Sequence, residues 1–75
     1  MGAGLPVLSP LEVERILLAL GFFYRPGKGA HRFYRHSDGR TTTVPFHKGR
    51  DIAPVLLRKI CRDVGLSAES FLKLR

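Results

Sequence analysis

The sequence predicts a single α+β domain with the element order α-β-β-β-α and a short helical tail. Three observations support this prediction: a capped, helix-periodic segment near the start, three short strand-like segments in the middle, and a second helix-periodic segment that ends in glycine. In a chain of 75 residues, this order fits one three-stranded antiparallel sheet with the helices on one face. Residues 1–75 are therefore predicted to form one domain with a small core.

The first helix is marked by its start and stop signals. Residues 1–8 contain glycine and proline without periodicity, and we expect them to form a loose N-terminal arm. Ser9, Pro10 and Glu12 have the spacing of a capping box with proline in the first turn, and Gly21 suits the residue after the helix. The apolar residues at helical spacing, expected to be buried, are Leu11, Val13, Ile16, Leu17 and Leu20.

Three strands are predicted next, at Phe22–Arg25, Ala30–His36 and Thr41–Phe46. Asp38 and Gly39 form a strong hairpin signal between the second and third strands. In the third strand, the alternation predicts that Thr42, Val44 and Phe46 face the helices. Four phenylalanines, Phe22, Phe23, Phe33 and Phe71, are expected in the core, whereas Tyr24 and Tyr34 suit either the core or the stacking of unpaired bases.

A second helix is predicted to begin at Asp51, just before Ile52-Ala53-Pro54, and to end at Gly65. Its apolar stripe includes Ile52, Val55, Leu56, Ile60 and Val64, with Cys61 packed beside it. Ser67 can cap a last short helix, from which Phe71, Leu72 and Leu74 are expected to close the core.

The charge of the chain indicates a polyanionic partner. The formal net charge is +7 and the isoelectric point is near 10.6, which suits RNA, DNA, an anionic membrane or an acidic protein. Cys61 is the single cysteine, so the chain can form neither an internal disulfide nor a thiolate metal site, and we expect a reducing, cytoplasmic setting. No apolar run is long enough to span a bilayer and no signal peptide is recognised, so no membrane partner is expected.

Histidines and basic residues are concentrated around the predicted central hairpin. All three histidines of the chain, His31, His36 and His47, lie there. The surrounding cations can be ordinary solvated charges, but together they suit a phosphate-binding track: Lys28, Arg32, Arg35, Arg40, Lys48 and Arg50. Sixteen residues separate His31 from His47, and no carboxylate or cysteine pattern completes a metal site, so no metal ligands are predicted.

The predicted order of elements is that of double-stranded-RNA-binding domains. The detailed motifs resemble those of the HicA (YcfA-like) family of mRNA interferase toxins, and the resemblance covers almost the whole chain. They comprise Gly29-Ala30-His31, Phe33-Tyr34-Arg35-His36, Asp38-Gly39-Arg40, Val44-Pro45, His47, Gly49-Arg50-Asp51-Ile52 and Gly65-Leu66-Ser67. One departure is Ala30, which stands where the family commonly has the serine of Gly-Ser-His.

The resemblance implies an endoribonuclease toxin that cleaves mRNA without a metal or other cofactor and arrests growth. It also implies that His31 is essential and that a cognate HicB-type antitoxin blocks the site. This chemistry is physically reasonable, because RNA supplies its own 2′-hydroxyl nucleophile and an imidazole can take its proton near neutral pH. Lys28 and Arg32 are candidates to stabilise the charged phosphorane, and the auxiliary candidates are Gly29, Tyr34, His36 and His47.

Both auxiliary histidines also have structural interpretations. His36, next to the turn, is expected to be structural or merely exposed, and His47 can fix the loop that leads to the second helix. Two non-enzymatic functions also stay open, namely a non-catalytic RNA-binding module of similar fold and, less favoured, a basic protein-interaction domain. The histidine that follows the glycine-led loop favours the enzyme, whereas Arg50 and the Arg58-Lys59 pair keep the RNA-binding module open.

Overall fold

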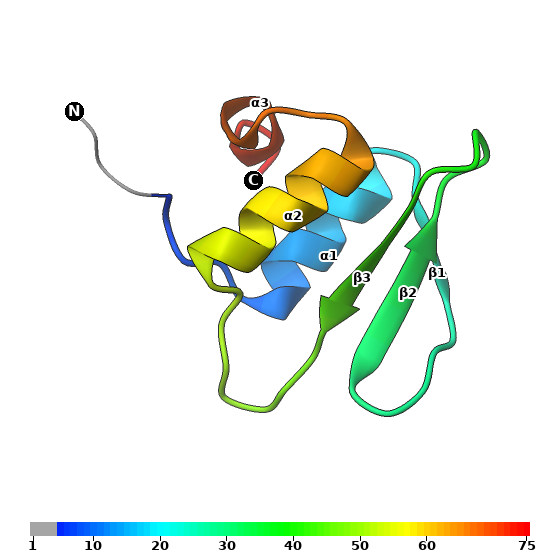
Figure 1. The fold of residues 1–75 in the computed structure, drawn as a ribbon, viewed down its shortest axis with the longest axis horizontal. Helices are drawn as coiled ribbons and strands as arrows, with labels where there is room; N and C mark the ends of the chain where they lie inside the picture. Colours follow the sequence, from blue (N-terminus) through cyan, green and yellow to red (C-terminus); the bar gives the residue numbers. More distant parts are fainter. Residues whose placement is uncertain (1–4) are drawn as a thin grey trace.

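The computed structural model describes residues 5–75 and confirms the predicted α+β architecture. Its elements are α1 (Pro10–Ala19), β1 (Phe23–Arg25), β2 (His31–Arg35), β3 (Thr41–Pro45), α2 (Pro54–Val64) and α3 (Ala68–Leu72). The three strands form one antiparallel sheet in the order β1-β2-β3. Helices α1 and α2 both pack against β3, and α3 packs against α2; Figure 1 shows α3 farther from the sheet than the other two helices.

Helix α1 begins with the predicted capping box. The Ser9 hydroxyl accepts a hydrogen bond from the Glu12 amide at 3.2 Å, and the Glu12 carboxylate accepts one from the Ser9 amide at 2.9 Å. These bonds satisfy two amide groups that would otherwise be unpaired at the helix start. Val13, Ile16 and Leu17 are buried as expected, whereas Leu11 is 59% exposed, so its assignment to the buried stripe was wrong.

The sheet buries only one face, and this decides which aromatic residues enter the core. Tyr34 lies on the side that faces the helices and is fully buried, together with Thr42 and Val44 of β3. Phe23 and Phe33 lie on the opposite, open face and are 41% and 37% exposed, so their predicted core positions were wrong. Because successive side chains of a strand alternate between faces, burying Tyr34 puts Phe33 outside.

The prediction of a loose arm over residues 1–8 was wrong at residue 8. Leu8 is fully buried and forms an antiparallel bridge with Ile52, whose amide donates to the Leu8 carbonyl at 2.7 Å. Residues 1–4, the beginning of the predicted arm, lie outside the described residues. The same bridge keeps Ile52 extended, so α2 begins at Pro54 after Ala53 and not at Asp51 as predicted.

The helical half closes the core largely as expected. Ile60, Cys61 and Val64 of α2 are buried with Phe71 of α3, and Gly65 ends α2 with a φ of +86°. Leu57 is also fully buried, although the predicted apolar stripe did not include it. The Ser67 hydroxyl caps α3 by accepting a hydrogen bond from the Ser70 amide at 3.1 Å.

Two apolar residues of this half were misplaced. Val55 and Leu74 are 79% and 43% exposed, so their predicted places in the apolar stripe and the core were wrong. Within residues 5–75, no helix has the length and apolar character needed to cross a membrane.

Candidate functional site

The central hairpin brings His31 and His47 together. His31 begins β2 and pairs with Pro45 at the end of β3, so His47 follows two residues beyond that pair. The Phe46 amide donates to the Ala30 carbonyl at 2.6 Å, which extends the strand pairing toward His47. The two imidazole rings contact edge to face, with centroids 5.7 Å apart and planes at 81°. Both side chains are exposed.

An open hollow of about 530 Å³ surrounds this histidine pair. Its lining comes from the ends of the hairpin and from one side of α2: His31, Thr43, Pro45, His47, Leu56 and Lys59. The Lys59 ammonium lies 3.0 Å from the Asp63 carboxylate but its side chain remains 61% exposed. The hollow therefore combines two imidazoles with a cation, a set that can bind an anion and exchange protons with it.

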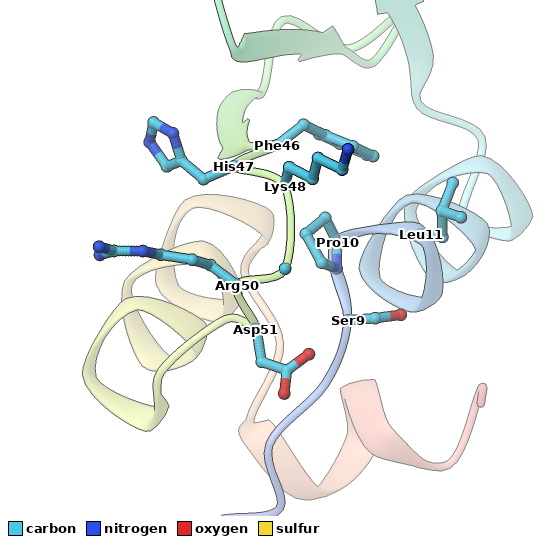
Figure 2. Close-up of a pocket in the computed structure, with 9 residues that line it drawn as sticks. Ser9, Pro10, Leu11, Phe46, His47, Lys48, Arg50 and Asp51 are labelled. Atoms are coloured by element: carbon cyan, nitrogen blue, oxygen red, sulfur yellow. The ribbon is translucent and has the colours of Figure 1, made fainter.

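The loop after β3 contributes further basic groups on both of its sides. It lines a second hollow together with the start of α1, formed by Ser9, Pro10, Leu11, Phe46, His47, Lys48, Gly49, Arg50 and Asp51. Figure 2 shows His47 and Arg50 extending to the same side of this loop, whereas Lys48 extends along Phe46 toward the other side. Of these two cations, Arg50 is thus the one directed to the same side as His47.

The backbone before His31 depends on a glycine that the sequence analysis did not single out. A Cβ atom on Gly27 would lie 2.6 Å from the His31 carbonyl oxygen, closer than real Cβ contacts come. The His31 amide also donates to the Lys28 carbonyl at 3.3 Å. Gly29, an auxiliary candidate, has a φ of +61°, which favours glycine. A Cβ atom added at this position would meet no other atom within 4 Å. A Pro-Gly pair such as Pro26-Gly27 is typical of a turn, but it does not indicate this close approach.

Tyr34 and Arg32 take part in a structural cluster on the helix-facing side of β2. The Tyr34 hydroxyl and the Arg32 guanidinium both donate to the same Glu14 carboxylate oxygen, the second at 3.0 Å. The guanidinium also lies 4.0 Å from the Phe46 ring centroid. Burial, followed by the bond to Glu14, raises the pKa of Tyr34 above its ordinary value.

This cluster lies on the other face of β2 from His31, because residues three apart on a strand point to opposite faces. The structure therefore does not bring Tyr34 to His31 as an auxiliary proton donor. Arg32, predicted to contact phosphate, is held by Glu14 and Phe46.

His36 and Arg40 stabilise the turn at the opposite end of β2. One ring nitrogen of His36 accepts a hydrogen bond from the Asp38 amide at 3.1 Å, and its ring packs against Phe22 at 5.1 Å. Arg40 donates to the Asp38 carboxylate at 2.8 Å and also to the Val64 carbonyl of α2. The bonds from Arg40 lower the pKa of Asp38 to about 2. These contacts tie the turn to α2 and keep both residues away from His31.

Four of the predicted phosphate-binding residues remain accessible. Their side chains are exposed and form no ion pair with an acidic residue in the part of the chain that the structure describes: Lys28, Arg35, Lys48 and Arg50. Arg25, which was not predicted, shares these properties and lies on the open face of the sheet next to Phe33. Within residues 5–75, no group of three or more histidine, cysteine or acidic side chains could hold a metal ion.

The comparison with known families identifies the family of the chain. The family described as the HicA toxin of bacterial toxin–antitoxin systems matches residues 11–66, whereas a search of curated proteins found no match. The matched segment extends from α1 to the end of α2 and includes Gly27, His31 and His47. Because the match covers most of the sequence, the chain belongs to the HicA toxin family of bacterial toxin–antitoxin systems, whose toxins have an antitoxin as partner.

Proposed function

We propose that this toxin is a metal-independent endoribonuclease that cleaves mRNA in the cytoplasm, with His31 as a catalytic acid/base. The observation that carries the proposal is the placement of an exposed His31 beside a second imidazole and the Lys59 ammonium in one open hollow. This combination suits a phosphodiester, which is anionic and reacts through proton transfer.

The chemistry follows from the substrate. The ribose 2′-hydroxyl is a nucleophile already attached to the phosphate that it attacks, so no metal-bound hydroxide is needed to supply one. His31 removes the proton of this hydroxyl as the 2′-oxygen bonds to phosphorus. The Lys59 ammonium lines the same hollow and can stabilise the negative charge that develops, and the Arg50 guanidinium, which extends to the same side of the loop as His47, is a second candidate for this role. The expected products carry a 2′,3′-cyclic phosphate and a free 5′-hydroxyl.

RNA affinity is assigned to the accessible cations Lys28, Arg35, Lys48 and Arg50. Arg32 and Arg40 are left out of this set because Glu14, Asp38 and the Val64 carbonyl already engage them. A HicB-type antitoxin would inhibit the toxin by covering the hollow around His31, because that would exclude the phosphate from the histidine pair.

The first test is cleavage of single-stranded RNA by the purified toxin in EDTA. Replacing the ribose at the cut site by deoxyribose should abolish the reaction, and His31→Ala should lower its rate by roughly 10² to 10⁴. His36→Ala is the matched histidine control and should lose much less activity, with circular dichroism confirming that both variants fold. Cleavage that persists on deoxyribose or requires added Mg²⁺ would contradict the mechanism.

A non-catalytic RNA-binding module is the second candidate, and the open face of the sheet favours it. There Phe23 and Phe33 are partly exposed beside Arg25 and Arg35, and aromatic rings with cations can stack and hold unpaired bases. If His31→Ala binds RNA like the parent and neither protein cleaves it, this function replaces the enzyme.

A further inference from the structure

We infer that His47 is the second proton-transfer group of the site and protonates the leaving 5′-oxygen while His31 deprotonates the 2′-hydroxyl. The inference rests on the proposed ribonuclease function. It goes beyond that function by giving a defined catalytic role to His47, which the sequence offered only as an unspecified auxiliary candidate or as a residue that fixes the loop.

The shared hollow lets both rings reach one phosphate. The attacking and leaving oxygens lie on opposite sides of phosphorus, so the base and the acid must approach the phosphate from two directions. Each group acts through a hydrogen bond of roughly 2.6–3.2 Å to its own oxygen, so both rings have to border the space in which the phosphate binds. The His31 and His47 centroids are 5.7 Å apart and both line the same hollow.

The other candidates for the acid are occupied elsewhere. Tyr34 is buried on the opposite face of β2 and its hydroxyl donates to Glu14. His36 lies at the far end of β2, with a ring nitrogen bonded to the Asp38 amide. Lys59 does line the hollow, but its ammonium is already paired with the Asp63 carboxylate at 3.0 Å. His47 remains as the exposed group next to His31.

Hydrogen bonds on both sides of the loop determine where His47 lies. Before it, Phe46 continues the strand pairing through its bond to the Ala30 carbonyl. After it, the Arg50 amide donates to the His47 carbonyl at 3.0 Å, and Ile52 is paired with Leu8. Such support from the backbone on each side is what a proton donor needs to keep a fixed distance from its partner.

The step is balanced for protons and bonds. Neutral His31 accepts the 2′-hydroxyl proton, the bond between the 2′-oxygen and phosphorus forms, and the bond between phosphorus and the 5′-oxygen breaks. Protonated His47 gives its proton to that 5′-oxygen. The reaction leaves His31 protonated and His47 neutral, and exchange with water restores both for the next turnover.

A sulfur-for-oxygen substitution in the substrate tests this role directly. A short RNA in which the leaving 5′-oxygen is replaced by sulfur releases a thiolate, which departs without being protonated. We expect His47→Ala to cleave the ordinary RNA roughly 10² to 10⁴ more slowly than the parent and to cleave the sulfur-containing RNA nearly as fast as the parent. His31→Ala should be slow on both substrates, because the 2′-hydroxyl still needs a base.

The pH profile provides a second measurement. The parent needs one neutral and one protonated imidazole, so its rate on ordinary RNA should be bell-shaped in pH. His47→Ala should lose the fall in rate on the alkaline side, where the acid would otherwise lose its proton. Thr41→Ala, an exposed substitution at the other end of β3, serves as the control and should retain both the rate and the profile.

The outcomes separate this inference from the proposed function. A parent protein that does not cleave RNA overturns the proposed function itself. A parent that cleaves while His47→Ala stays within a few-fold of it, or is equally slow on both substrates, overturns only the role of His47. His47→Asn is made as a second variant; if both His47 variants unfold in circular dichroism, the side chain is structural and the inference is wrong.

Discussion

Removing the Tyr34 hydroxyl with Tyr34→Phe should weaken the fold while leaving RNA cleavage intact. The hydroxyl donates to Glu14, a carboxylate that is 17% exposed, and phenylalanine keeps the ring that fills the core. A hydrogen bond to a charged group contributes roughly 1.5–3 kcal/mol. Because Glu14 keeps its bond to Arg32, we expect a loss of about 1.5–2 kcal/mol, at the lower end of that range.

This loss can be measured as a thermal shift. For a domain of this size, each kcal/mol lowers the unfolding temperature by roughly 4–8 °C, so the midpoint should fall by about 6–16 °C. The raised pKa of Tyr34 adds a pH signature, because stability should decline as the pH rises above the ordinary value of 10.0 and the unfolded state loses its phenolic proton more readily. In Tyr34→Phe, this alkaline decline should be smaller.

The matched control is Tyr24→Phe, which removes a hydroxyl from a side chain that is 47% exposed. It should change the unfolding temperature by much less. A Tyr34→Phe protein that unfolds at the parent temperature but has lost RNA cleavage would refute this reasoning, because the phenol would then belong to the chemistry.

Three further predictions follow from the burial, ion pairs and charges of single side chains. Leu8→Ala should cost about 2–5 kcal/mol in urea denaturation because it empties a fully buried position, whereas Val7→Ala, at a position 54% exposed, should cost far less. Arg40 lowers the pKa of Asp38, so the ionised Asp38 stabilises the fold above pH 3.8 and this stabilisation is lost as the pH falls toward about 2. The urea midpoint of Asp38→Asn should therefore change less than that of the parent protein across this pH interval. Lys48→Ala should reduce the salt slope of binding to single-stranded RNA by roughly 0.7 without changing sequence preference, as fluorescence titrations can show.

Local signals in the sequence predicted most of the elements, because a few neighbouring residues determine them. The capping box of Ser9 and Glu12 and the left-handed Gly65 depend on residues within four positions, and both were correctly predicted. The bridge between Leu8 and Ile52 joins segments on either side of the whole sheet, and no local pattern indicates it. Missing it led to both the overextended arm and the wrong start of α2.

The candidate site shows a similar division. Alternation along β2 separates Phe33 from Tyr34, but only the packing shows which face the helices cover. The contact between His31 and His47 depends on the register of the hairpin. His36 pairs with Arg40 across a three-residue turn, which places position 31 opposite position 45, next to the loop that carries His47; the Asp38-Gly39 signal alone does not determine this register. The close approach of Gly27 to the His31 carbonyl depends on three-dimensional detail and could not be predicted.

The position of Gly27 affects how a single substitution could change the candidate site. Gly27 carries no functional group, yet any side chain there would collide with the backbone that carries His31. A single methyl group at this turn would therefore shift the backbone that carries His31, although every histidine and cation stays in the sequence. If the proposed function holds, such a substitution would lower RNA cleavage. A comparison of sequences that inspected only histidines and cations would not detect the change.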